Sequence, residues 1–167
     1  MGRGEAALVR AAQRGDASGI EALFRLHWPK ALRAAYLVIH DAAAAEDIAQ
    51  ESFLAALRSL DRFDRRRPFG PWLHRIVVNR AIDWSRARQL RAEAELGEGI
   101  AAPEQAPPLD GSLLAALAAL PPDHRAVIVL RHLLGYTPGE IAKLLELPRG
   151  TVNSRLRRGL DSLKERV

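Results

Sequence analysis

The chain is 167 residues long, has 48% apolar residues and no cysteine, and carries a net charge of +5 with a pI of about 10.4. The lack of cysteine excludes disulfides and thiolate catalysis, and no stretch approaches the roughly 20 apolar residues that a membrane-spanning helix needs. The first residues also lack the apolar core of a signal peptide, so we expect a cytoplasmic protein that does not insert into a membrane.

The charges are unevenly distributed along the chain. Residues 1–92 carry a net charge of +6, residues 93–110 a net charge of −5, and residues 111–167 a net charge of +4. Two basic blocks on either side of an acidic connector are expected if both blocks meet an anionic polymer. The alternative is an ordinary solvated surface with scattered charges.

The pattern is helical from the start, because runs with period-two alternation are missing. We expect a short helix over residues 5–14, ended by Gly15, and a long helix over 18–39 capped by Asp16 and kinked at Pro29. Asp41 caps a third helix that ends near Leu60. A basic loop over 61–68 leads into a fourth helix over 69–90.

Apolar stripes on the third and fourth helices predict one shared core for the first block. The stripe residues are Ala49, Phe53, Ala56, Leu57 and Leu60 on the third helix, and Leu73, Ile76, Val77 and Trp84 on the fourth.

The polar face of the third helix carries Asp47, Gln50 and Glu51 at spacings of three and four residues, which predicts one acidic patch opposite the apolar stripe. Such a patch in a basic domain suits a basic protein partner. The alternative is a solvated helix face.

Basic residues lie beside aromatic residues in the loop and the fourth helix, a combination that suits single-stranded or distorted DNA. The alternative is that these cations only face solvent, and we expect Trp72 itself to belong to the core. The candidate residues are Arg65, Arg66 and Arg67 in the loop, with Arg75, Asn79 and Arg86 on one helix face.

Residues 92–110 contain three prolines, two glycines and no basic residue, and they are too poor in apolar residues to fold alone. We therefore expect an all-α protein with two small helical domains, residues 1–91 and 111–167, joined by a flexible acidic linker. The second domain begins with a short helix containing Leu113 to Leu120, followed by a helix over 123–134 that Gly135 ends.

The last thirty residues predict a helix-turn-helix. Thr137 and Glu140 fit a capping box with Pro138 at the first helical position, and residues 148–150 separate this helix from the next. Val152, Leu156 and Leu160 are expected to face inward. The outward residues, which can bind base edges or phosphates, are Arg149, Thr151, Asn153, Ser154, Arg155, Arg157 and Arg158. The alternative is a helical hairpin with a basic solvent face.

No catalytic constellation is evident, and we expect neither an enzyme nor a cofactor. The five histidines lack metal-ligand spacing, and no glycine-rich phosphate loop follows a strand. Asp61 and Asp64 are interpreted as turn residues.

The two blocks resemble the extracytoplasmic-function (ECF) sigma factors of bacterial RNA polymerase. Residues 44–54 (AAEDIAQESFL) and 69–83 (FGPWLHRIVVNRAID) are similar to sigma region 2. Residues 120–130 (LPPDHRAVIVL), 135–137, 140–142 and 150–156 (GTVNSRL) are similar to sigma region 4.

The resemblance implies specific partners and roles. Asp47, Gln50 and Glu51 correspond to the contact with the clamp coiled coil of the β′ subunit, and region 4 to the part that meets the β flap. The loop over 62–68 and the helix bearing Asn79 correspond to the part that recognises and opens the −10 element, and residues 149–158 to the part that reads the −35 element. The family often has an anti-sigma factor as a further partner, and no small-molecule substrate is implied.

Two other interpretations remain open on the sequence. A stand-alone helix-turn-helix regulator would act as a dimer without polymerase, although no spare apolar helix is available for a dimer interface. A protein that only sequesters an anti-sigma factor would not need the arginines of the last helix.

Overall fold

The computed structural model describes residues 3–95 and 111–167, which are helical and contain no strand in those two ranges. Most of the expected linker, residues 96–110, lies outside the described residues. Within the two ranges no helix is long and apolar enough to cross a membrane.

The first block consists of four helices and one 3₁₀ turn. The helices are α1 (Arg3–Gln13), α2 (Ala17–Ile39), α3 (Ala42–Arg58) and α4 (Phe69–Glu95), with the turn η1 (Leu60–Arg62) between the last two. Asp16 caps α2 by accepting a hydrogen bond from Ser18 N at 2.9 Å, and Asp41 caps α3 by accepting one from Ala44 N at 3.0 Å. Both predicted caps are confirmed.

The second block consists of α5 (Gly111–Ala118), α6 (Pro122–Ile128), α7 (Pro138–Leu145) and α8 (Arg149–Arg166). A π-helical turn, η3 (Val129–Leu133), continues α6 where the sequence predicted an uninterrupted helix. Gly135 follows with a φ of +78°, a left-handed conformation that glycine adopts without strain, as its predicted place after the helix requires.

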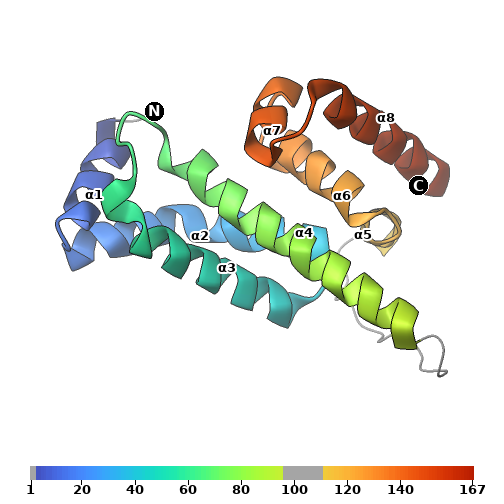
Figure 1. The fold of residues 1–167 in the computed structure, drawn as a ribbon, viewed down its shortest axis with the longest axis horizontal. Helices are drawn as coiled ribbons and strands as arrows, with labels where there is room; N and C mark the ends of the chain where they lie inside the picture. Colours follow the sequence, from blue (N-terminus) through green and yellow to red (C-terminus); the bar gives the residue numbers. More distant parts are fainter. Residues whose placement is uncertain (1–2, 96–110) are drawn as a thin grey trace.

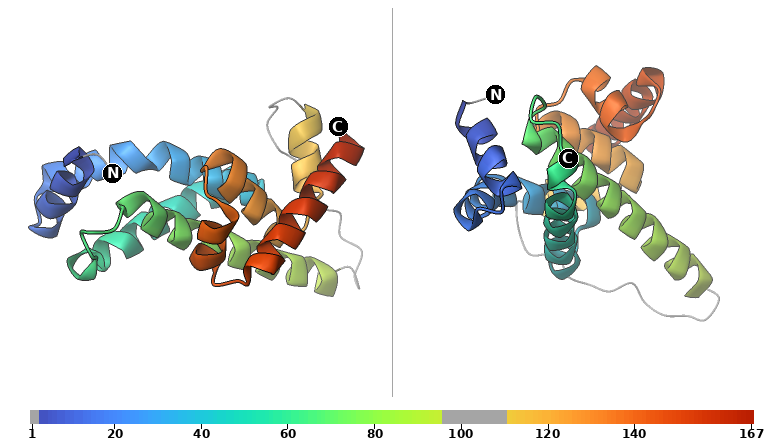
Figure 2. Two further views of the ribbon diagram at one scale, coloured as in Figure 1. Left: turned by 90° about the horizontal axis from the view of Figure 1, so that it is seen from above. Right: turned by 60° about the vertical axis from the view of Figure 1, so that its left-hand side comes forward.

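Helix α4 lies at the centre of the molecule (Figure 1), with α3 on one side and the second block on the other, while α2 packs on α4 and also contacts α5 and α6. The views in Figure 2 agree with this arrangement, and α4 contacts α2 and α3 as well as α6 and α7. The buried side chains of both blocks belong to one contiguous hydrophobic cluster. The two predicted domains are therefore packed against each other rather than held apart.

The buried side chains of α4 differ in part from the predicted stripe. Leu73 and Val77 are buried as predicted, whereas Ile76 and Trp84 are only half-buried. Val78 and Ala81, outside the predicted stripe, are also fully buried. The helix also runs beyond its expected end at Leu90, to Glu95.

Candidate nucleic-acid interfaces

The capping box that starts the helix-turn-helix is present. The Thr137 backbone N–H donates to the Glu140 carboxylate at 2.8 Å, and the Thr137 hydroxyl accepts from Glu140 N at 3.3 Å. The Thr137 backbone N–H and the Thr137 hydroxyl, which donates to the same carboxylate at 2.7 Å, lower the pKa of the Glu140 carboxyl. Helix α7 then ends at Glu146, which adopts a left-handed φ of +56°.

Helix α8 packs on the rest of the second block through a mostly predicted set of residues. Val152 and Leu156 are buried, but Leu160 is only half-buried, and Gly159 and Leu163 provide contacts that the sequence pattern did not single out. A Cβ atom at Gly159 would lie 2.6 Å from the Ile128 Cδ1 atom. The glycine therefore allows α8 to approach α6 closely.

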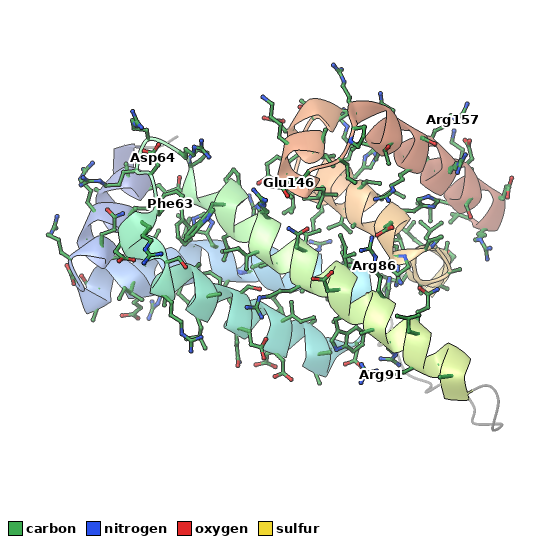
Figure 3. The ribbon with its side chains drawn as sticks, viewed as in Figure 1. Phe63, Asp64, Arg86, Arg91, Glu146 and Arg157 are labelled. Carbon is green, nitrogen blue, oxygen red and sulfur yellow. The ribbon has the colours of Figure 1, made fainter. Side chains whose placement is uncertain are left out.

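The opposite face of α8 is basic and open to solvent. Arg157 points away from the body of the molecule in Figure 3. Of the other predicted base- and phosphate-binding residues, Arg149, Asn153 and Arg158 are exposed, and Thr151 and Ser154 are half-buried. The exception is Arg155, which forms an ion pair with Asp123 at 3.2 Å. This geometry leaves a short cationic helix accessible for the major groove.

The loop before α4 contains three arginines next to a pair of packed aromatic rings. Phe63 is buried, with its ring centroid 4.6 Å from that of the half-buried Trp72. Arg65 and Arg67 are exposed, whereas Arg66 pairs with Asp64 through two contacts of 3.0 and 3.1 Å. Asp64 also accepts from the Arg66 backbone N–H at 3.0 Å, which confirms its interpretation as a turn residue.

Two arginines of the predicted basic face of α4 form ion pairs with the second block, although Arg86 remains exposed. Arg75 forms an ion pair with Glu146 at the end of α7, and Arg86 pairs with Asp123 of α6 at 2.7 Å. Figure 3 shows Glu146 and Arg86 at this boundary. The structure thus brings Arg75 and Arg86 to the boundary between the blocks, with the half-buried Asn79 between them on the same helix.

A histidine–tyrosine pair that the sequence analysis did not select joins the blocks at the same boundary. The His74 Nδ1 atom lies 2.7 Å from the Tyr136 hydroxyl, within hydrogen-bond distance. Burial lowers the pKa of His74 to about 4, helped by the nearby His27 and Lys30, so the ring is neutral at pH 7. His74 and Tyr136 lie within the two quoted motifs, but nothing in either motif indicates that they meet.

The predicted acidic patch on α3 is exposed. Asp47 and Gln50 are exposed, and Glu51 forms an ion pair with Arg80 of α4 at 2.9 Å. The side-chain amide of Gln50 donates to Glu46 at 3.4 Å, which adds a fourth residue to the patch. Leu54, one turn further along α3, is 51% exposed. Acidic residues beside an exposed leucine form a surface that a basic partner helix can bind.

Residues 3–95 and 111–167 contain no group of three His, Cys, Asp or Glu side chains placed to hold a metal ion. The candidate binding surfaces are the acidic patch of α3, the basic loop and face of α4, and the basic face of α8.

Each half of the chain matches a protein-family model. Residues 23–91 match the model "Sigma-70 region 2", and residues 110–163 match "Sigma-70, region 4". The two matches occur in the same order as the two helical blocks.

Similar proteins of known type cover almost the whole chain. The ECF RNA polymerase sigma factor SigW of Bacillus subtilis is 30% identical, over 95% of this chain and 94% of SigW. The ECF RNA polymerase sigma factor SigL of Mycobacterium tuberculosis is 34% identical, again over 95% of this chain and 94% of SigL.

Two solved structures with the same fold are complexes with other proteins. RpoE, in complex with the anti-sigma factor NepR from Bartonella quintana, superposes with a TM-score of 0.71 at 25% identity, over 87% of this chain and 94% of RpoE. CnrH, in complex with the cytosolic domain of CnrY, superposes with a TM-score of 0.65 at 27% identity, over 96% of this chain and 95% of CnrH.

Proposed function

The chain belongs to the ECF sigma factors of the sigma-70 family, and from that premise we propose how its two blocks divide the work of promoter-specific transcription initiation. Residues 1–91 bind core polymerase and recognise and open the −10 element. Residues 111–167 read the −35 element in duplex DNA, and residues 92–110 connect the two. The observation that carries this division is the open basic face of α8 on a capped helix-turn-helix in the second block.

The acidic patch of α3 is the proposed contact with core polymerase. Asp47, Gln50 and Glu51 would meet the basic β′ clamp coiled coil, with the exposed Leu54 supplying apolar contact. The patch faces away from the second block, since α3 and the second block lie on opposite sides of α4 (Figure 1). This contact would therefore remain available whether or not the two blocks are packed together.

The basic face of α8 is the proposed −35 reader. Arg157 and Arg158 are exposed and free to approach base edges or phosphates, with Arg149, Thr151, Asn153 and Ser154 at the start of the same helix. Arg155 would join them once its ion pair with Asp123 is released.

The loop and the basic face of α4 are the proposed −10 surface. Arg65, Arg66 and Arg67 would neutralise the phosphates of the non-template strand, while Arg75, Asn79 and Arg86 would contact the strand along α4. Because Arg75 and Arg86 pair with acids of the second block, this surface becomes complete only when the blocks separate. We therefore expect the chain to be closed when free and open on polymerase.

We also propose the setting in which the chain works. It would act in the cytoplasm without catalytic chemistry of its own, lending specificity to the polymerase and meeting the β flap through region 4. Since the sigma factor RpoE, which has the same fold, forms a complex with the anti-sigma factor NepR, an anti-sigma factor is a proposed partner that would hold the closed form.

Reconstitution with bacterial core RNA polymerase tests the function directly. We expect transcripts from a genomic library that share −35 and −10 sequences and that disappear when the chain is omitted. The variant Asp47→Arg with Glu51→Arg should lose core binding while remaining folded. Asp161→Arg with Glu165→Arg, which makes the same charge change at the same spacing on exposed positions of α8, serves as its control. Sequence-specific DNA binding without any core binding would instead indicate a stand-alone regulator.

A further inference from the structure

A cavity at the boundary between the two blocks is lined by a buried arginine. It has a volume of about 630 Å³, within the range typical of small-molecule sites. Its walls come from the end of α2, the second half of α4, and the segment from α5 to α6. Both blocks are therefore needed to form it.

The arginine is Arg125 of α6, whose side chain points into the boundary rather than to the surface. Arg125 is only 8% exposed, and burial lowers its pKa to about 10. The buried Nε–H has no hydrogen-bond partner among the side chains that the structure describes, and none of the described ion pairs includes Arg125. A buried cation without a counter-ion is unfavourable by several kcal/mol, so such groups are ordinarily paired.

Two further unpartnered polar groups line the same cavity. The Ser85 hydroxyl is buried and without a partner, and both ring nitrogens of His40 are buried and without partners. Burial and the nearby Arg125 charge lower the pKa of His40 to about 4, so its neutral ring offers one N–H donor. An arginine, a hydroxyl and an imidazole together form a donor set suited to an oxyanion.

The other described charged side chains of the cavity pair with each other and not with Arg125. Asp41 and Arg88 also line it, but their side chains pair with each other at 3.0 Å. Arg88 in addition lies 5.1 Å from the centroid of the Trp84 ring. Trp84 and Leu120 supply apolar wall on either side of the boundary.

We propose that this cavity is a binding site for a small organic anion that bears a phosphate or carboxylate group. Arg125 would bind the oxyanion, Ser85 and His40 would donate hydrogen bonds to it, and the apolar walls would hold the body of the molecule. The ligand is bound and not transformed.

The site also has a consequence for the closed arrangement. Because the donors come from both blocks, an anion bound there favours the packed form over the separated one. It would therefore oppose use of the −10 face of α4. Only this consequence rests on the function proposed above, since binding itself can be measured without polymerase.

Binding is tested by thermal unfolding and calorimetry on the full chain with inorganic phosphate, pyrophosphate and citrate as probes, against chloride at the same ionic strength. At ten times its Kd, a bound anion should raise the Tm by about 3–6 °C. Preference for phosphate and pyrophosphate, or for citrate, identifies the anionic group. Equal shifts with chloride would overturn the proposal.

Variants separate this site from general surface effects. Arg125→Met should weaken binding of the preferred probe by roughly 10-fold or more, and Ser85→Ala should weaken it less. Arg91→Met, which removes an exposed arginine of α4 outside the cavity, is the matched control and should bind normally. Unchanged affinity in both cavity variants would overturn the site.

The same variants distinguish an anion-binding arginine from a merely structural one. Since no described side chain pairs with Arg125, Arg125→Met should be at least as stable as the natural chain in anion-free buffer. Binding should also raise the pKa of His40, measured by NMR, because a nearby anion favours the charged ring. A His40 pKa that does not move on saturation would contradict the assigned donors. If binding holds but does not weaken affinity for a −10 single strand, the consequence for closure is wrong and the site stands.

Discussion

Helices α4 and α8 each carry a row of arginines, but only α8 leaves most of its row accessible. Arg149, Arg157 and Arg158 of α8 are exposed, whereas Arg75 and Arg86 of α4 pair with Glu146 and Asp123 of the second block. The difference shows that a basic helical face becomes a DNA surface only when no acid of the same chain reaches it. In the packed form the basic face of α8 is open, whereas two arginines of the proposed −10 surface are held in ion pairs with the second block.

The largest expected effect comes from preventing separation of the blocks. Gln89 of α4 and Ala119, just after α5, line the same cavity from the two blocks, and both are exposed. Because the chain has no cysteine, Gln89→Cys with Ala119→Cys can be bridged by a short bismaleimide. We expect transcription from a cognate promoter to fall by about 100-fold or more, because the competent form is removed from the population.

Duplex binding through α8 should survive the same bridge. Each single-cysteine variant treated with the reagent serves as the control and should transcribe normally. Full transcription by the bridged protein would show that the −10 face works without separation.

Removing one cation from the accessible face tests the other half of the comparison. Arg157→Ala should weaken binding to the −35 duplex by about 1–3 kcal/mol if a bidentate base contact is lost. The loss should be equal in the bridged and unbridged proteins, since this face is not covered. Fluorescence anisotropy on a −35 duplex and on a scrambled one gives the answer. An equal loss on both sequences would mark a phosphate contact.

The boundary should also respond to pH, because burial lowers the pKa values of His74 and His40 to about 4. Between pH 6.5 and 4 the unfolded chain binds protons at these rings that the packed form does not. The contribution of these rings to the free energy of unfolding should therefore be fully present above pH 6.5. It should fall as the pH falls toward 4, by up to about 1.4 kcal/mol per pH unit for each ring.

Denaturant titrations at several pH values measure this dependence. His74→Phe should flatten the curve, and His132→Gln, which changes an exposed histidine, should not. A curve that His74→Phe leaves unaltered would contradict the role of burial at this position.

The smallest effect is expected from the ion pairs themselves. Glu146→Gln and Asp123→Asn should each free an arginine of α4 and raise affinity for a −10 single strand by roughly 1.5- to 5-fold, because exposed pairs contribute about 0.2–1 kcal/mol. Glu165→Gln removes an exposed acid of α8 and is the control. If Glu146→Gln and Asp123→Asn instead lose affinity, these two acids do not restrict the access of DNA to Arg75 and Arg86.

Local signals could be predicted from the sequence, and contacts between the blocks could not. Asp16, Asp41 and Thr137 cap their helices as expected, because each cap involves residues within a few positions of one another. The pair formed by His74 and Tyr136 joins positions 62 residues apart.

The candidate surfaces follow the same division. The outward face of α8 follows from the helical period of its own sequence. In the same way, the spacing of the acidic-patch residues places them together on α3. The burial of Val78 and Ala81, by contrast, was not predicted from the apolar stripe of α4. The cavity around Arg125 exists only where two blocks meet, so no motif in either block predicts it.

The most direct test of the proposed opening is the distance between the blocks in solution. Arg58→Cys on α3 and Lys164→Cys on α8 place fluorophores on two exposed positions of the otherwise cysteine-free chain. Single-molecule energy transfer should give one short-distance population for the free chain and a longer distance with core polymerase and promoter DNA. A long distance in the free chain, or the same short distance on polymerase, would contradict the closed-to-open account.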